Sequence, residues 1–225
     1  MRQEWYNMYI IKRTEQNDIE SALIQEGACN MAHDFKFSLI GAHYSNAIEQ
    51  IRNMDYVNNF DHSNLNYTIE DYDSFRKDIC YGILGIYSMN ALVESVVNYC
   101  IRELDYYDII EFRQKVNKLC QQGIIENDEN LDKYFELRKY RNIITHWERD
   151  SLKYDLGSMG YIRLMGSNYY ANNNKERLVQ ILHKAEMINY FHSIMTIINN
   201  VIGSQYFSDD DLLKTYLEGE IEVDF

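Results

Sequence analysis

Arginine, asparagine and histidine stand close together in one segment, which carries most of the chemistry that the sequence offers. The segment runs from Leu137 to Trp147, and it places Arg141 and Asn142 just ahead of His146. An arginine is a permanent cation whose planar fork of donors grips phosphate. A histidine gives or takes a proton near neutral pH. Together they are the smallest set of groups that can move protons around a phosphodiester without a metal.

The spacing of arginine and histidine is by itself a weak signal. The chain holds 11 arginines and 6 histidines, so about one match to Arg-x4-6-His is expected by chance. A second match does occur, from Arg177 to His183, where it frames the apolar residues of an ordinary core helix. The surroundings of the first match, Arg141 to His146, therefore decide its value.

Around the first match, polar and apolar residues separate onto two faces of a helix predicted over 131–149. At about 100° per residue, one face is an apolar stripe of Leu137, Tyr140, Ile144 and Trp147. The opposite face carries two cations, an amide and an imidazole within about 80° of one another: Arg138, Asn142, His146 and Arg149. Arg141 itself lies about 140° from His146. Two such helices across a two-fold axis are therefore expected to lend the arginine and the histidine to each other.

In order, in spacing and in the polar residue after the arginine, Arg141-Asn142-x3-His146 resembles the motif of the HEPN (higher eukaryotes and prokaryotes nucleotide-binding) superfamily. The resemblance includes a preceding amphipathic helix with Ala91–Asn98 and covers roughly residues 70–202. It implies an all-α bundle that forms a homodimer, with two motifs at the interface. Many members are metal-independent endoribonucleases of toxin–antitoxin, anti-phage defence and RNA-surveillance systems. RNA or a nucleotide, a second copy of the chain and an antitoxin protein are thus the expected partners.

The resemblance also implies a role for each residue in RNA cleavage, where the 2′-OH attacks the adjacent phosphorus and leaves a 2′,3′-cyclic phosphate. His146 is expected to act as general acid and base, Arg141 to stabilise the phosphoryl oxygens, and Asn142 to orient the imidazole or the phosphate. The substrate-binding candidates are Arg138 and Arg149 for flanking phosphates, with Glu94 and Asn98 in a supporting polar shell. No metal or cofactor is expected.

Two other interpretations of the segment stay open. His146 is a surface or interface histidine in the first, while Arg141 pairs with a nearby acid such as Glu136 or Glu148. In the second, the chain is a HEPN-like module without catalysis that serves in dimerisation, nucleotide sensing or partner binding. The acidic body favours this module, and the intact Arg-Asn-x3-His favours the enzyme. Glu148 also stands where one subgroup, paired with a nucleotidyltransferase antitoxin, carries tyrosine, which argues against that partner.

The composition is that of an acidic globular protein. At 225 residues, with 46% hydrophobic and 25% charged residues, the chain suits one domain with a sizeable core. The net charge of -13 argues against a protein that coats nucleic acid through charge alone, and it disfavours anionic membranes. No signal segment and no apolar run near ~20 residues is recognised. We therefore expect a cytoplasmic protein that does not engage a membrane.

The elements that must position the motif are long helices, because proline is absent and glycine is scarce at ten residues. The clearest helix is predicted over 70–104, where only Asn90 interrupts an apolar stripe with steps of three and four. At ~1.5 Å per residue this helix would be ~50 Å long, so we expect it to bend or to pack against a partner. Other helices are predicted over 18–54 (two helices or one bent helix), 107–121, 131–149 and 175–202.

The predicted fold is all-α, a single domain built as an up-and-down helical bundle. Residues 1–66 are an N-terminal helical extension, and 67–203 are the HEPN-like core with an irregular or hairpin insertion at 150–174. Residues 204–225 are a C-terminal appendage, within which Ser208 is expected to cap the start of a helix.

Overall fold

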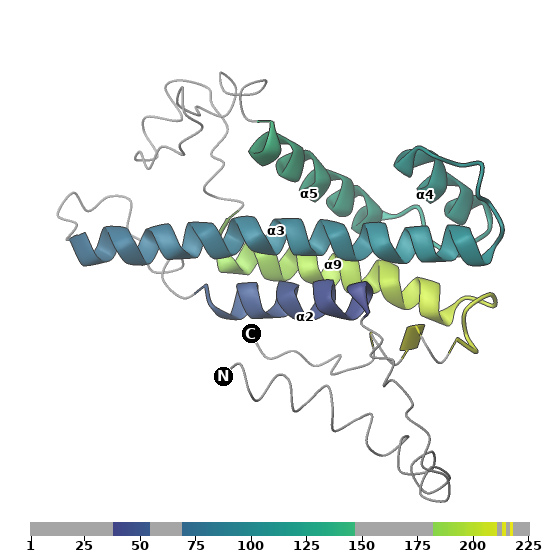
Figure 1. Cartoon of the computed structure of the whole chain (residues 1–225), viewed down its shortest axis with the longest axis horizontal. Helices are drawn as coiled ribbons and strands as arrows, with labels where there is room; N and C mark the ends of the chain where they lie inside the picture. The colour runs from purple at the N-terminus through teal and green to yellow at the C-terminus, as the bar shows by residue number, and fades with distance from the viewer. Residues whose placement is uncertain (1–37, 55–68, 147–181, 211–212, 215–216, 218–225) are drawn as a thin grey trace, which may run out of the picture. The chain divides into compact units, whose positions relative to one another are not determined.

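Helix α3 is the element around which the other helices pack. In the computed structural model it spans Ile69–Glu103, within one residue of the predicted bounds. Apolar residues are buried on several of its sides: Ile86, Met89, Leu92, Val93, Val96, Val97 and Cys100. Helices α2, α4, α5 and α9 all contact it (Figure 1). Because α3 has 35 residues and so is ~52 Å long, different helices cover different stretches of it.

The structure describes residues 38–54, 69–146, 182–210, 213–214 and 217. Of these residues 77% are helical, in five helices and without a strand, which confirms the all-α prediction. The remaining helices are α2 (Leu39–Arg52), α4 (Phe112–Gln121), α5 (Glu129–Thr145) and α9 (Lys184–Gly203). All described residues belong to one compact unit, Ser38–Phe225. The predicted insertion at 150–174 and the helix expected before residue 38 lie outside the described residues.

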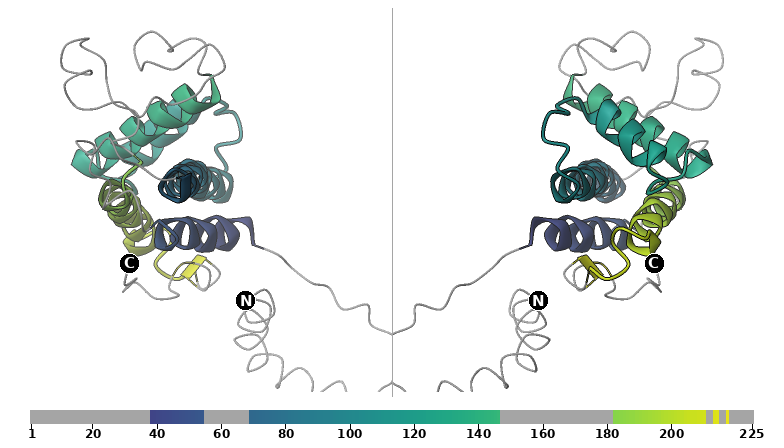
Figure 2. Two further views of the ribbon diagram at one scale, coloured as in Figure 1. Left: turned by 90° about the vertical axis from the view of Figure 1, so that its left-hand side faces the viewer. Right: turned by 90° about the vertical axis from the view of Figure 1, so that its right-hand side faces the viewer.

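The four longer helices, α2, α3, α5 and α9, alternate in direction, as in an up-and-down bundle. Gly85 of α3 lies so close to α9 that a Cβ placed there would be 2.8 Å from the Cε of Met187. Gly82, one turn earlier, faces Leu182, so α9 runs parallel to α3. The chain colours in Figure 1 show that α2 and α5 run the opposite way. Figure 2 looks along α3 and shows α2, α5 and α9 at different sides of it.

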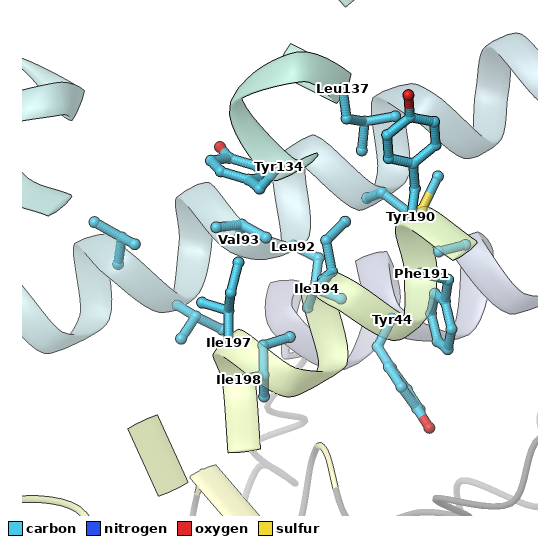
Figure 3. Close-up of a cluster of buried hydrophobic side chains, with 14 of the residues drawn as sticks. Tyr44, Leu92, Val93, Tyr134, Leu137, Tyr190, Phe191, Ile194, Ile197 and Ile198 are labelled. Carbon is cyan, nitrogen blue, oxygen red and sulfur yellow. The ribbon is translucent and has the colours of Figure 1, made fainter. Parts of the chain in front are cut away.

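One hydrophobic core is shared by α2, α3, α5 and α9. Figure 3 shows its centre, with Tyr44 of α2, Leu92 and Val93 of α3, Tyr134 and Leu137 of α5, and Tyr190, Phe191, Ile194, Ile197 and Ile198 of α9. Helix α2 brings Ala47 and Ile51 to this core, whereas Leu39 at its first turn is 63% exposed. Helix α2, which the sequence assigned to the N-terminal extension, is therefore part of the bundle.

Helix α4 is shorter than the sequence predicted. It begins at Phe112, and residues 104–111 form turns and irregular backbone instead of helix. Asp105, with a φ of 58°, turns the chain away from α3. Ile110, inside the predicted helix but outside α4, is 85% exposed. Val116 and Leu119 of α4 are buried.

Asp210, and not Ser208, caps the C-terminal helical segment. Its Oδ1 accepts a hydrogen bond from the backbone N–H of Leu213 at 2.9 Å. The hydroxyl of Tyr99 on α3 donates to its Oδ2. The carboxylate of Asp210 therefore caps the helical segment and also connects it to α3 through a hydrogen bond.

By length and composition alone, one described helix could cross a membrane, the Arg76–Glu103 part of α3. Half of the 18-residue window that meets this criterion is buried inside the structure. The criterion does not separate a membrane span from the central helix of a bundle.

Replacing Leu92 by alanine should lower the free energy of unfolding by about 2–5 kcal/mol, because this side chain is fully buried in the core. Leu39 on α2 is 63% exposed, so Leu39→Ala should cost less than about 1 kcal/mol. Urea denaturation followed by circular dichroism measures both. Equal losses would contradict the central position of α3.

Candidate functional site

The carboxylate of Glu94 brings together two of the arginines that the sequence singled out. Arg138 Nη1 and Arg141 Nη2 both donate to its Oε1, the second at 2.9 Å. Helix α3 supplies the carboxylate and α5 supplies both guanidinium groups. The side chains of Arg138, Arg141 and Glu94 are 24%, 25% and 30% exposed, so water and small ions reach them. We refer to these three residues as the arginine–glutamate cluster.

Arg138 is held by contacts on three helices. Its guanidinium carbon lies 4.2 Å from the ring centroid of Phe112 on α4, a cation–π contact. Its Nη1 is also 3.5 Å from the hydroxyl of Tyr134, one turn earlier on α5. Burial raises the pKa of Tyr134 although Arg138 acts against this, so the hydroxyl stays protonated. The place of Arg138 therefore does not depend on Glu94 alone.

Arg141 is paired with an acid, Glu94, that the sequence analysis did not name as its partner. Glu136 accepts a hydrogen bond from Tyr140 at 3.0 Å, and Glu148 lies outside the described residues. The bond to Glu94 occupies Nη2 of Arg141. Since a guanidinium carries five N–H donors, it can bind an anion without losing this contact.

Helix α5 ends at Thr145, so His146 is not inside the helix as predicted. It is the C-cap residue, with φ -119° and ψ 44°, and its N–H donates to the carbonyl of Asn142 at 2.8 Å. The side chains of Asn142 and His146 are exposed. The predicted angle of about 140° between Arg141 and His146 assumed a continuous helix. It does not apply to a residue whose backbone has left helical geometry.

Tyr87 of α3 anchors this last turn of α5. Its hydroxyl oxygen lies 2.9 Å from that of Thr145. Thr145 Oγ1 donates its own hydrogen to the carbonyl of Arg141 at 2.8 Å, so Tyr87 is the donor in the first contact. Sequence reasoning missed both residues. The available signal was that Tyr87 lies two helical turns before Glu94 and so shares its side of α3.

The predicted polar face of α5 is divided in the structure. Arg138 turns toward α3 beside Arg141, while Asn142 and His146 face solvent. The prediction placed Arg138 opposite an apolar stripe that contains Tyr140. In the structure Tyr134 is the fully buried ring of α5 and Tyr140 is only partly buried, so the core-facing side lies closer to both arginines.

Two further candidates do not join the cluster. Asn98, one turn after Glu94 on α3, accepts a hydrogen bond from Nζ of Lys115 at 2.7 Å and so helps to fasten α4. Arg149 lies outside the described residues. Within the described part of the chain, no three His, Cys, Asp or Glu side chains are grouped closely enough to hold a metal ion. Burial raises the pKa of the Cys100 thiol to about 12, which makes it a poor nucleophile at neutral pH.

Comparison of the chain with protein-family models, with curated proteins and with solved structures finds no match. A relationship to the HEPN superfamily is therefore a proposal that rests on the motif and on the site.

Asp128 sets the start of α5 and should make that helix sensitive to acid. Burial raises the pKa of this carboxyl, but the hydrogen bonds from Asn130 and Leu131 lower it more, so the net shift is downward from 3.8. Its stabilisation is thus present above the unfolded-state pKa and is lost as the pH falls through the lower folded-state value. Asp128→Ala should cost about 1 kcal/mol at neutral pH.

Urea denaturation of wild type and Asp128→Ala, repeated from about pH 6 to about pH 2, tests this expectation. The difference in unfolding free energy should shrink toward the acid end. Asp132→Ala removes another acid from the first turn of α5 and serves as the control. A cost of Asp128→Ala that does not change with pH would contradict the capping role of the carboxylate.

Proposed function

We propose that this chain is a metal-independent endoribonuclease that works as a homodimer. The observation that carries the proposal is the arginine–glutamate cluster, whose Arg141 directly precedes the exposed Asn142 and stands five residues before the exposed His146 at the end of α5. Anion-binding donors and a group able to transfer protons thus stand at one end of one helix. This is the pair of functions that phosphodiester cleavage by an internal 2′-OH requires.

The chemistry divides among the residues as follows. His146 takes the proton of the 2′-OH as general base and then, in its protonated form, returns a proton to the leaving 5′-oxygen as general acid. Arg141 stabilises the charge that develops on the phosphoryl oxygens. Asn142 orients the imidazole or the phosphate, and Arg138 holds a flanking phosphate. The products are a 2′,3′-cyclic phosphate and a free 5′-OH.

The homodimer would complete the site by placing the histidine of one copy near the arginines of the other. An exposed apolar strip on α3 supports an interface at this place. Leu84 is 48% exposed and Tyr87 is 36% exposed, and Tyr87 contacts Thr145 next to His146. A two-fold axis through this strip would bring two α5 ends together. We place the enzyme in the cytoplasm as a toxin or anti-phage defence effector, for which an antitoxin is the natural partner.

A non-catalytic module for dimerisation, nucleotide sensing or partner binding is the second candidate function. The pairing of Arg141 with Glu94 favours it, because the carboxylate already compensates one of the two positive charges. Such a module would bind a phosphate-containing ligand or a protein partner at the same place without cleaving it.

Incubation with mixed RNA in the presence of EDTA distinguishes the two functions. His146→Ala and Arg141→Ala should each lower the cleavage rate by about 100-fold or more, since each removes a group that acts in the transition state. His183→Ala and Arg177→Ala alter the second Arg-to-His match and should leave the rate unchanged. Equal activity in all variants contradicts the assignment, and activity in none favours the module.

A mixing experiment tests whether the site is shared between copies. Arg141→Ala and His146→Ala chains mixed in equal amounts should recover roughly a quarter of the wild-type rate, because half of the dimers are mixed and carry one complete site. No recovery after subunit exchange would mean that each chain supplies both residues of its own site.

A further inference from the structure

We propose that the arginine–glutamate cluster is a phosphate-binding site in which Glu94 acts as an internal anion that the ligand's phosphate group displaces. The inference deepens the proposed function, on which its choice of phosphate esters as the ligand class rests. It assigns Glu94 a regulatory role at the same site in place of a purely supporting one.

The contact geometry supports this role. A single oxygen, Oε1 of Glu94, accepts hydrogen bonds from the guanidinium groups of both Arg138 and Arg141. An oxygen of a phosphate group held between two arginines would make the same pair of charge-assisted bonds. Phosphate offers further oxygens to the remaining donors, so it can make more bonds here than the carboxylate does.

The charges of the cluster also favour an anionic ligand. Two guanidinium groups share one carboxylate, which leaves one positive charge on a chain whose net charge is -13. Without any anion the two guanidinium groups would repel each other, so Glu94 keeps them together while no ligand is bound. The same carboxylate opposes binding, because a phosphate must either replace it or lie beside a like charge.

Displacement requires few movements. Arg138 keeps its contacts with Phe112 and Tyr134 when Glu94 leaves, so half of the site is already in place. Glu94 is 30% exposed and can turn toward solvent. Arg141 lies one turn along α5 from Arg138 and needs only to exchange one acceptor for another. The site thus stays closed to weakly held anions and opens for a phosphate group that makes more bonds than the carboxylate.

Thermal unfolding with inorganic phosphate tests the proposal without RNA. Wild type, Glu94→Gln and Glu103→Gln are compared at constant ionic strength, with phosphate replacing chloride. Glu103 lies on the same helix and also binds an arginine, but that pair is 61% and 45% exposed. Phosphate should bind Glu94→Gln about tenfold or more tightly than it binds wild type, because a competing charge is gone. The apparent affinity follows from the rise in Tm with phosphate concentration.

Glu103→Gln should bind phosphate as wild type does, and the double variant Glu94→Gln/Arg141→Gln should lose the gain. If Glu94→Gln is unfolded without ligand, phosphate should refold it and should not refold the double variant. Affinity in Glu94→Gln equal to that of Glu103→Gln, or weaker than that of wild type, overturns the proposal. If Glu94→Gln is unfolded and phosphate does not refold it, the proposal is also overturned.

Failure of this proposal can be told apart from failure of the proposed nuclease function, because phosphate binding does not require RNA cleavage. An inactive chain in which Glu94→Gln binds phosphate more tightly supports the internal anion and rejects the nuclease. If the chain cleaves RNA but Glu94→Gln gains no affinity for phosphate, the nuclease function stands and Glu94 is a positioning residue. Where both proposals hold, Glu94→Gln should raise kcat/KM for RNA with little change in kcat, because the gain is in binding.

Discussion

Burial of α3 on several sides at once is the constraint on which the rest of the structure depends. Leu92 and Val93 are buried among α2, α5 and α9, so none of these helices can slide along α3 without uncovering apolar surface. The register of α5 follows from Tyr134 and Leu137, which enter the same core. That register brings the arginines of α5 level with Glu94. The polar cluster is therefore a consequence of hydrophobic packing, and its own bonds then refine the fit.

Burying α3 in this way also buries a polar side chain, which lowers the stability of the fold. Asn90, one turn before Glu94, is buried with its Nδ2 donating to Ile86 and with no partner for Oδ1 among the described residues. An unpaired buried acceptor costs about 1–3 kcal/mol. Partial exposure of the arginine–glutamate cluster avoids a much larger cost, since fully buried ion pairs lose hydration that their attraction seldom repays. The partly exposed side of α3 that carries Glu94 therefore holds charged groups close to the core, where ligands can still reach them.

A small cationic site on an acidic chain makes chemical sense for both proposed functions. The net charge of -13 repels nucleic acid at long range, so binding must come from specific contacts. Arg138 and Arg141 can provide such contacts, and Glu94 limits them to ligands that compete with a carboxylate. An RNA-cleaving enzyme that stays idle on most RNA, and a sensor selective for a nucleotide, would both benefit from this restraint.

The sequence by itself determined the helical class, the bounds of α3 and the segment that supplies both arginines of the arginine–glutamate cluster. These follow from local rules, because the absence of proline and the three-and-four spacing of apolar residues act within one helix. Candidates such as Glu94 could be named from the motif, but their contacts could not. The arginines find a carboxylate 44 and 47 residues away, a pairing that no helical periodicity encodes.

Only the tertiary structure decided which side of α5 faces the core and where that helix ends. The sequence analysis chose the apolar stripe of α5 that contains Tyr140. Packing in the core instead buries Tyr134 most fully and turns Arg138 toward Glu94, and the helix ends before His146. Side-chain direction on a helix with two plausible faces depends on its neighbours, and neighbours far apart in the chain meet only after folding.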